Sequence, residues 1–356
     1  MALRSFRQSR SEAMILGRSG YVAAAIGALL IAVFLLSRPL PAAAEHAAVQ
    51  RCYPPIRLGF SLIPACNGPG AQQRSWVSPS AARGGIIYVS EWGANEVELF
   101  SASPGYQQLG VLTGFTSPQG ITVDRKGNLY VANTNGSDVL IYARGATSPS
   151  RTLMDPGEGP ADVAVAPDGT VYVANETNAS GSGGSISIYP PGATTPSRTL
   201  TNSQFYFVIG VCLDRSLNLY VSFNSSASGG GEVFQLSRSG RQWSASDTGI
   251  RVTWGGMPAV DDAGYVVEPD QGSPYVSGAV NVYAPGPVKL YAFAGPGQPL
   301  AVALREGERR AYVSRPDLGV AQVWTYPGPT VRLLASLPAI GGGGTSTIAV
   351  DPSDDE

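Results

Sequence analysis

Polar side chains recur at one position of a repeated segment in this chain of 356 residues. The position lies three residues after a recurring tyrosine, and its occupants, in order, are Glu91, Asn133, Asn175, Phe223, Glu268 and Arg315. Asp162 stands near the start of the apolar run that precedes one of these tyrosines. Carboxylate and amide oxygens are the ligands that a hard divalent cation such as Ca²⁺ prefers. The candidate ligand- or metal-binding residues are therefore Glu91, Asn133, Asp162, Asn175 and Glu268.

A second interpretation of the same residues needs no ligand. Asn and Asp are common at turns, and polar side chains at strand ends hydrogen-bond to loop backbone and to water. Phe223 and Arg315 occupy the same position in two of the six copies, and neither side chain suits a cation site. The sequence leaves both interpretations open.

The single histidine of the chain, His46, restricts the possible enzymatic mechanisms. It lies outside the repeated region, so a Ser-His-Asp or Cys-His mechanism is excluded within that region. The glycine runs at 229–231 and 341–344 lack the Lys-Ser/Thr pair and the strand-to-helix context of a phosphate-binding loop. No Cys/His zinc spacing occurs either. We assign no catalytic residue from the sequence.

The elements that must position these residues are the short strands of a repeat. The recurring tyrosines, 42 to 48 residues apart, are Tyr88, Tyr130, Tyr172, Tyr220, Tyr265 and Tyr312. Each lies in the second of four strand-like segments, and Asp-x-x-Gly stretches at 124–127 and 261–264 suit tight hairpins between the first and second segments. Six copies of about 45 residues with four strands each are typical of a six-bladed β-propeller, whose sheets stack radially and bury one another's faces.

The two ends of the repeated region predict how the ring closes. The first copy has no inner strand before Ile86, and the segment from Thr345 to Pro352 resembles an inner strand with nothing after it. We expect this C-terminal strand to pair with the N-terminal blade, which leaves no exposed sheet edge. A seventh blade would need strands from residues 45–80, which lack the required alternation.

The segment Pro118 to Asn133 reads Pro-Gln-Gly-Ile-Thr-Val-Asp-Arg-Lys-Gly-Asn-Leu-Tyr-Val-Ala-Asn and resembles the NHL repeat. Over about residues 84–352 the chain is similar to the group of six-bladed propellers that contains gluconolactonase-like and streptogramin-lyase-like enzymes. The resemblance implies a ligand site at the mouth of the central channel. Gluconolactonase-like enzymes hold a metal there with Glu, Asn and Asp, which makes Ca²⁺ a possible cofactor. The lyase-like enzymes depend on a histidine base, which this ring lacks.

The N-terminal residues predict export. Residues 1–44 carry five arginines and one glutamate, and Tyr21 to Leu36 is an unbroken run of 16 apolar or small residues. Pro41-Ala42-Ala43-Ala44 then provides an Ala-x-Ala cleavage site. This order is typical of a secretory signal peptide. An uncleaved membrane anchor at residues 21–36 is the alternative, and both place the rest of the chain outside the cytoplasm, secreted or periplasmic.

Between this segment and the propeller, residues 45–83 form a Cys/Pro/Gly-rich stretch that we interpret as a linker. Its two cysteines, Cys52 and Cys66, are a possible disulfide in an oxidising compartment. Cys212 lies in an apolar run and is expected to be a buried free thiol. The propeller is predicted over residues 84–352, followed by an acidic tail at 353–356.

The charge distribution and the repeat together indicate a class of function. Because the whole chain carries −2 and residues 1–44 carry +4, the rest carries −6, which argues against nucleic-acid binding. We expect an exported, non-enzymatic binding or scaffold module for a protein, a peptide or an envelope glycan. Trp92 and Tyr206 offer aromatic surfaces for such a ligand. The alternative is a divalent-metal-dependent hydrolase or lactonase of the gluconolactonase-like type.

Overall fold

A computed structural model describes residues 74–156, 158–177, 183–227, 229–273, 276–305, 307, 309–328, 330–338 and 345–351. The predicted signal segment, Cys52, Cys66 and the acidic tail lie outside these residues. No helix within the described ranges is long and apolar enough to cross a membrane.

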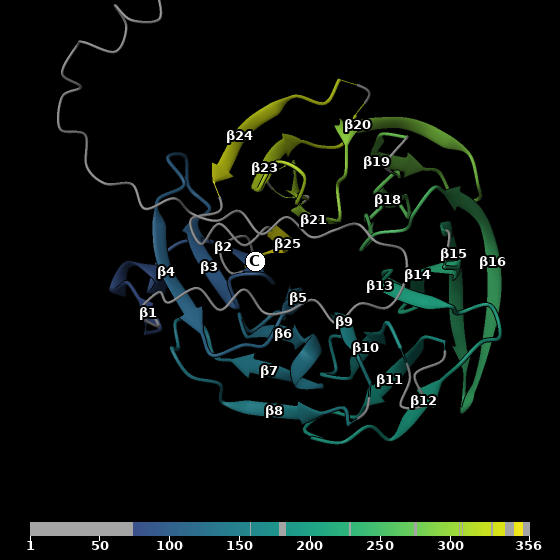
Figure 1. Cartoon of the computed structure of the whole chain (residues 1–356), viewed down its shortest axis with the longest axis horizontal. Helices are drawn as coiled ribbons and strands as arrows, with labels where there is room; N and C mark the ends of the chain where they lie inside the picture. The colour runs from purple at the N-terminus through teal and green to yellow at the C-terminus, as the bar shows by residue number, and fades with distance from the viewer. Residues whose placement is uncertain are drawn as a thin grey trace, which may run out of the picture. The chain divides into compact units, whose positions relative to one another are not determined.

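The described chain folds into six antiparallel sheets arranged in a ring, as Figure 1 shows. Blade 1 consists, from the centre outward, of β25 (Thr345–Val350), β2 (Ile86–Glu91), β3 (Glu96–Ser101), β4 (Gln108–Thr113) and β1 (Trp76–Val77). Blade 2 consists of β5 (Pro118–Val123), β6 (Leu129–Asn133), β7 (Asp138–Tyr142) and β8 (Arg151–Met154). Blade 3 consists of β9 (Pro160–Val165), β10 (Val171–Asn175), β11 (Ser185–Tyr189) and β12 (Arg198–Leu200).

The second half of the ring repeats the same order of strands. Blade 4 consists of β13 (Phe207–Leu213), β14 (Leu219–Ser226), β15 (Gly229–Ser239) and β16 (Gln242–Val252). Blade 5 consists of β17 (Ala259–Val260), β18 (Val266–Asp270), β19 (Gly278–Tyr283) and β20 (Lys289–Gly297). Blade 6 consists of β21 (Ala301–Arg305), β22 (Arg310–Arg315), β23 (Val320–Thr325) and β24 (Leu333–Pro338). The 3-10 turns η1 (Pro79–Ala82) and η2 (Thr134–Gly136) are short.

The predicted six-bladed propeller with four-stranded blades is confirmed. Five of the six recurring tyrosines lie within the second strand of their blade, and Tyr265 directly precedes β18. The structure adds one element: β1 pairs with β4 and gives blade 1 a fifth strand within the stretch that we interpreted as linker. Cys212 lies in β13 as a free thiol, but its side chain is only partly buried.

The alternation of side chains explains why the sheets form a ring. In β2, Ile86 and Tyr88 pack toward blade 2, while Ile87 and Val89 pack toward blade 6. Neighbouring residues of a strand point to opposite faces, so a strand that is apolar at every position must be covered on both sides. We call the interface between two neighbouring blades a joint, and each of the six joints contains its own cluster of buried apolar side chains.

The hairpins between first and second strands follow the predicted chemistry. The Asp124 carboxylate accepts hydrogen bonds from the backbone N–H groups of Lys126 and Asn128, at 2.8 and 2.9 Å. Gly127 completes the turn with a φ of 79°, in the left-handed region that glycine tolerates best. Blade 4 has Leu217 in this role with a φ of 62°, so this hairpin carries backbone strain that the glycine-containing hairpins avoid.

The ring closes where β25 pairs antiparallel with β2, with Tyr88 opposite Ala349 and Val89 opposite Ile348. Asp351, just beyond β25, has a fully buried side chain, and its Oδ2 lies 2.6 Å from Nε of Arg144 in the chain after β7. The C-terminal strand therefore completes blade 1 and also connects it to blade 2.

Closure by β25 predicts a large effect of a single truncation in that strand. Ile348 is 3% exposed and packs in the joint between blades 6 and 1, so Ile348→Ala should lower the free energy of unfolding by about 2–5 kcal/mol. Urea denaturation of the purified protein measures this change. Leu334→Ala, at a side chain that is 49% exposed on β24, should change it by less than about 0.5 kcal/mol. Equal losses for the two variants would contradict a closing role for β25.

Candidate functional site

Glu91, Asn133 and Asn175 end the second strand of their blades, Glu268 lies within the second strand of blade 5, and Asp162 lies in the first strand of blade 3; all five are buried. Glu91 and Glu268 are 0% exposed, and Asn133, Asn175 and Asp162 are at most 6% exposed. Asp162 lies in β9 opposite Ala174, next to Asn175 in β10, so these two candidates share blade 3. Glu91, Asn133 and Glu268 belong to blades 1, 2 and 5.

Asn133 ties the loop before its own blade to its own hairpin. Its Oδ1 accepts a hydrogen bond from the backbone N–H of Thr116 at 2.5 Å, and its Nδ2 donates to Oδ1 of Asp138 at 2.8 Å. Both ends of the amide are thus used within blade 2 and the segment that enters it.

Asp162 connects the inner strands of blades 3 and 4. Oδ1 accepts from the backbone N–H of Val163 at 2.9 Å, and Oδ2 accepts from the backbone N–H of Val211 in β13 at 3.0 Å. Burial raises the pKa of this carboxyl to about 7, although the two N–H donors act in the opposite direction. The side chain thereby satisfies a backbone donor on the inner strand of the next blade, where no further strand pairs with it.

Glu268 makes the corresponding connection between blades 4 and 5. Its Oε1 accepts from Oγ of Ser222 at 2.7 Å and from the backbone N–H of Gly256 at 3.1 Å. Burial raises its pKa to about 8, so the neutral carboxyl predominates at neutral pH. Asn224 adds a further link, accepting from the backbone N–H of Gly255 at 3.1 Å. This joint has the smallest set of buried apolar residues of the six, Val233, Ile250, Val266 and Tyr283.

Asn175 faces the third strand of its own blade. Its Nδ2 donates to Oγ of Ser185 at 3.1 Å and to Oγ of Ser187 at 3.0 Å. Glu91 lies opposite Glu96 in β3 and opposite Thr345 in β25, so its backbone takes part in ring closure.

Of the remaining two members of the recurring position, Phe223 serves packing and Arg315 makes local hydrogen bonds. Phe223 packs against Phe205 and Phe234, with ring centroids 4.8 and 4.9 Å away. The guanidinium of Arg315 donates to both carboxylate oxygens of Asp317 and to the backbone carbonyl of Ala294. Neither contact involves a candidate ligand of the predicted metal site.

The structure therefore distributes the predicted site over several joints. The hydrogen bonds of Asn133, Asp162, Asn175 and Glu268 go to separate partners, and none joins two of these four side chains. In the part of the chain that the structure describes, no three His, Cys, Asp or Glu side chains form a group that could hold a metal ion. The assignment of a cation to the channel mouth stays a prediction. In the described geometry Asp162 and Glu268 connect neighbouring blades, whereas Asn133 and Asn175 bond within their own blade or the segment that enters it.

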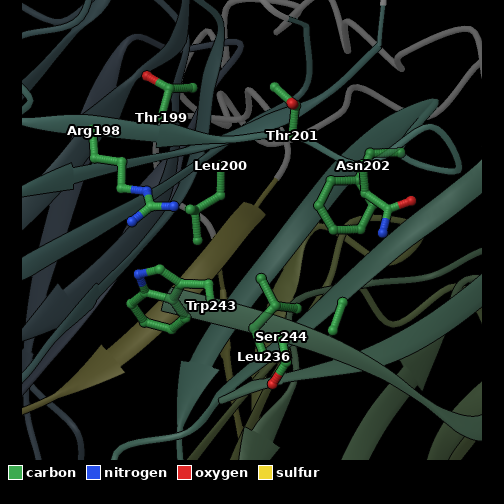
Figure 2. A pocket seen from close by; sticks show the side chains of 10 residues that line it. Arg198, Thr199, Leu200, Thr201, Asn202, Leu236, Trp243 and Ser244 are labelled. Atoms are coloured by element: carbon green, nitrogen blue, oxygen red, sulfur yellow. The ribbon is translucent and has the colours of Figure 1, made fainter. Parts of the chain in front are cut away.

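A cavity of about 260 Å³ lies at the rim of the ring, between the outer strands of blades 3 and 4. Its lining residues are Arg198, Thr199, Leu200, Thr201, Asn202, Phe205, Leu236, Trp243, Ser244 and Ala245. In the view of Figure 2, Arg198 and Trp243 lie on one side of the cavity, and Thr201 and Asn202 lie on the other. Nη1 of Arg198 is held by the backbone carbonyl of Arg241 at 2.6 Å.

Sequence reasoning missed this cavity because no local motif marks it. The cavity depends on β15 and β16, which are 11 residues long each, whereas β12 across the joint has three residues. Trp243 lies near the start of β16 and packs edge-on against Tyr172 of blade 3, with ring centroids 6.0 Å apart. β15 and β16 lie between Tyr220 and Tyr265, and this spacing of 45 residues is ordinary for the repeat, so the sequence does not indicate that these outer strands are extended.

Comparison with known proteins agrees with the fold. A family model described as "Beta-propeller repeat" matches residues 106–138, and no curated protein matches the chain. A chain of a nidogen/laminin complex is similar over 76% of this chain and 100% of its own, with 11% identity and a TM-score of 0.60. The hydrazine synthase of Kuenenia stuttgartiensis is similar over 83% of this chain and 94% of its own, with 16% identity and a TM-score of 0.56.

A gluconolactonase from Xanthomonas campestris is similar over 74% of this chain and 87% of its own, with 16% identity and a TM-score of 0.52. Identities this low establish a shared propeller fold and leave the function open. The structural neighbours accordingly range from a nidogen/laminin complex to gluconolactonases.

The raised pKa of Glu268 predicts a pH dependence of stability. The folded state keeps a proton up to about pH 8, whereas the unfolded chain releases it above the ordinary value of 4.5. The contribution of Glu268 to the free energy of unfolding is therefore complete below pH 4.5. It decreases as the pH rises toward 8, by up to about 1.4 kcal/mol per pH unit. Asp162 should also lower the free energy of unfolding as the pH rises, between pH 3.8 and about pH 7, because burial raises its pKa over that range.

Glu268→Gln, which cannot lose a proton, should flatten this decline, and the double variant with Asp162→Asn should flatten it further. Urea denaturation between about pH 5 and 8 measures the slope. Asp262→Asn removes a carboxylate that is 45% exposed and pairs with Arg215 at the surface, and it should keep the wild-type slope. A Glu268→Gln variant with the wild-type slope would show that this carboxyl is not the buried acid responsible.

Proposed function

We propose that this chain is an exported, non-enzymatic β-propeller that binds an envelope glycan in the cavity between blades 3 and 4. The composition of the cavity wall supports this proposal above all. Of its ten lining residues only Arg198 carries an ionisable side chain, while the others are aliphatic, aromatic, hydroxyl or amide groups. Such a wall can hold a ligand but offers no acid–base pair to transform it.

The chemistry of the lining suits a sugar ring. A pyranose has a face of C–H groups, which packs on an aromatic side chain, and a rim of hydroxyl groups, which needs donors and acceptors. Trp243 supplies partly exposed apolar surface, backed by Phe205 and Leu236, which are only 3% and 4% exposed, while Asn202 and Thr201 supply polar groups. The volume of about 260 Å³ is slightly smaller than the usual range for small-molecule pockets, which starts near 300 Å³, and this favours a small unit of a larger glycan.

Cleavage of such a glycan would require two carboxyl groups on either side of the glycosidic bond. The cavity lining contains none, and Asp162 and Glu268 are buried in the joints and hydrogen-bonded to backbone N–H groups. The alternative, a metal-dependent lactonase, is supported by the similar fold of a gluconolactonase. No feature of the described site supports it. The chain that resembles this one was solved as part of a nidogen/laminin complex, so a similar ring takes part in a protein complex there.

The proposal predicts that Trp243 dominates binding. Trp243→Ala should weaken affinity for the bound sugar at least about tenfold, because it removes the largest aromatic surface of the cavity. Calorimetric titration of the full chain with a panel of neutral and acidic envelope oligosaccharides measures this change. Trp76→Ala, at an exposed tryptophan on β1, is the matched control and should bind as the wild type does. If no oligosaccharide binds, or if both variants bind equally, the proposal fails.

Export is the second part of the proposal, and it is supported by the arginines, the apolar run and the Ala-x-Ala site of residues 1–44. Expression of the full chain followed by cell fractionation should find it outside the cytoplasm. N-terminal sequencing should then give a mature protein that begins at Glu45. An intact N-terminus in the membrane fraction would favour the anchor at residues 21–36, and an intact chain in the cytosol would contradict export.

A further inference from the structure

A chain of buried oxygen atoms connects blades 2 and 3 away from the cavity. Asp155 follows the last strand of blade 2, and its Oδ1 accepts from Oγ of Ser187 at 3.0 Å. Oγ of Ser187 also accepts from Nδ2 of Asn175 at 3.0 Å, as does Oγ of Ser185 at 3.1 Å. Ser185 in turn donates to Oε2 of Glu158 at 2.7 Å. We call these five residues the oxygen cluster.

Two oxygens of this cluster are buried without a hydrogen-bond partner, Oδ2 of Asp155 and Oδ1 of Asn175. The two residues are 1% and 0% exposed, so both oxygens are shielded from bulk solvent. Both atoms are acceptors, and they belong to side chains that share the hydroxyl of Ser187. Two buried acceptors that lack a hydrogen-bond donor, on side chains linked through the same hydroxyl, are an unfavourable arrangement that a bound cation would relieve.

The electrostatic environment of Asp155 contains no such charge. Burial is the main cause that raises the pKa of its carboxyl to about 6, and the nearby carboxyl of Glu158 raises it further. Hydrogen bonds from Ser187, Tyr189 and Asn175 lower this pKa, and none of these groups is basic.

The oxygen cluster departs from the repeat that surrounds it. Residues 145–153 and 192–200 are nearly identical in sequence, but the first segment leads to Met154-Asp155 and the second to Thr201-Asn202. Asn202 caps the backbone N–H of Gln204 at 3.0 Å in place of reaching the next blade. Within blade 3, Ser187 lies opposite Val173, whereas the corresponding pair in blade 2 is Leu140 opposite Val131. The carboxylate and the hydroxyl that meets it are thus both specific to this joint.

We propose that the oxygen cluster binds a hard divalent cation of the Ca²⁺ type, held by Asp155, Asn175 and Glu158. Carboxylate, amide and hydroxyl oxygens are the donors that Ca²⁺ selects, and water completes its six to eight ligands. The site lies at the outer part of the joint between blades 2 and 3, and it includes only Asn175 of the residues that the sequence suggested for the channel mouth. Its role is structural, since the cation ties the end of β8 to β10 and β11. It does not depend on glycan binding.

Thermal unfolding of the full-length, chelator-treated protein with and without CaCl₂ tests this site. Saturating Ca²⁺ should raise the unfolding midpoint by about 2–6 °C, because a ligand that binds only the folded state stabilises it. Asp155→Asn should abolish the increase. Asp168→Asn makes the same chemical change at a hairpin of blade 3, where the carboxylate only caps Thr170, and it should keep the increase.

Terbium luminescence gives a second readout that does not rely on stability. The hydroxyl of Tyr189 donates to the carbonyl of Met154, next to Asp155, so this ring lies close enough to sensitise Tb³⁺ in the oxygen cluster. Ca²⁺ should displace the Tb³⁺ signal in the wild type and in Asp168→Asn, and the signal should be absent in Asp155→Asn. Glu158→Gln serves as the test if Asp155→Asn does not fold. The proposal is overturned if Ca²⁺ stabilises wild type and cluster variants equally, or if it stabilises neither.

Discussion

The structure depends on the fact that a single blade has two apolar faces and cannot bury either one alone. Strands such as β2 are buried at every position, and their alternate apolar residues enter different joints. Every blade therefore needs two neighbours, which a row of sheets cannot provide at its ends. Closure of the ring by β25 removes the two unpaired ends, and the apolar clusters of the joints then stabilise all six blades together.

Hydrogen bonds of buried polar side chains connect neighbouring blades, including at the joint with few buried apolar residues. The inner strands leave backbone N–H groups that no further strand can pair, and the carboxyl of Asp162 accepts one of them from the neighbouring blade. Glu268 acts similarly at the joint with the fewest buried apolar residues. These carboxyls have raised pKa values because they are buried, and raised pKa values are also common in active sites. The hydrogen-bond geometry assigns them to connecting blades.

Features that differ from joint to joint are the places to look for function on such a repetitive scaffold. The long strands β15 and β16 open a cavity beside the short β12, with Trp243 in its wall. The joint between blades 2 and 3 instead gathers Asp155, Ser187 and Asn175 around unsatisfied oxygens. A rigid ring holds both sites in place, so a ligand meets preorganised groups at little conformational cost.

The amino-acid sequence alone determined the architecture of this protein. The tyrosine spacing located the second strand of each blade, the Asp-x-x-Gly turns located the hairpins, and the unpaired segment after Thr345 predicted ring closure. These features are local or periodic, so they can be read along the chain. The sites were decided by tertiary structure. Asp155 and Ser187 are 32 residues apart, and no local pattern indicates that the end of one blade meets the third strand of the next. The recurring polar position was visible in the sequence, but which partner each side chain found depended on how the blades pack.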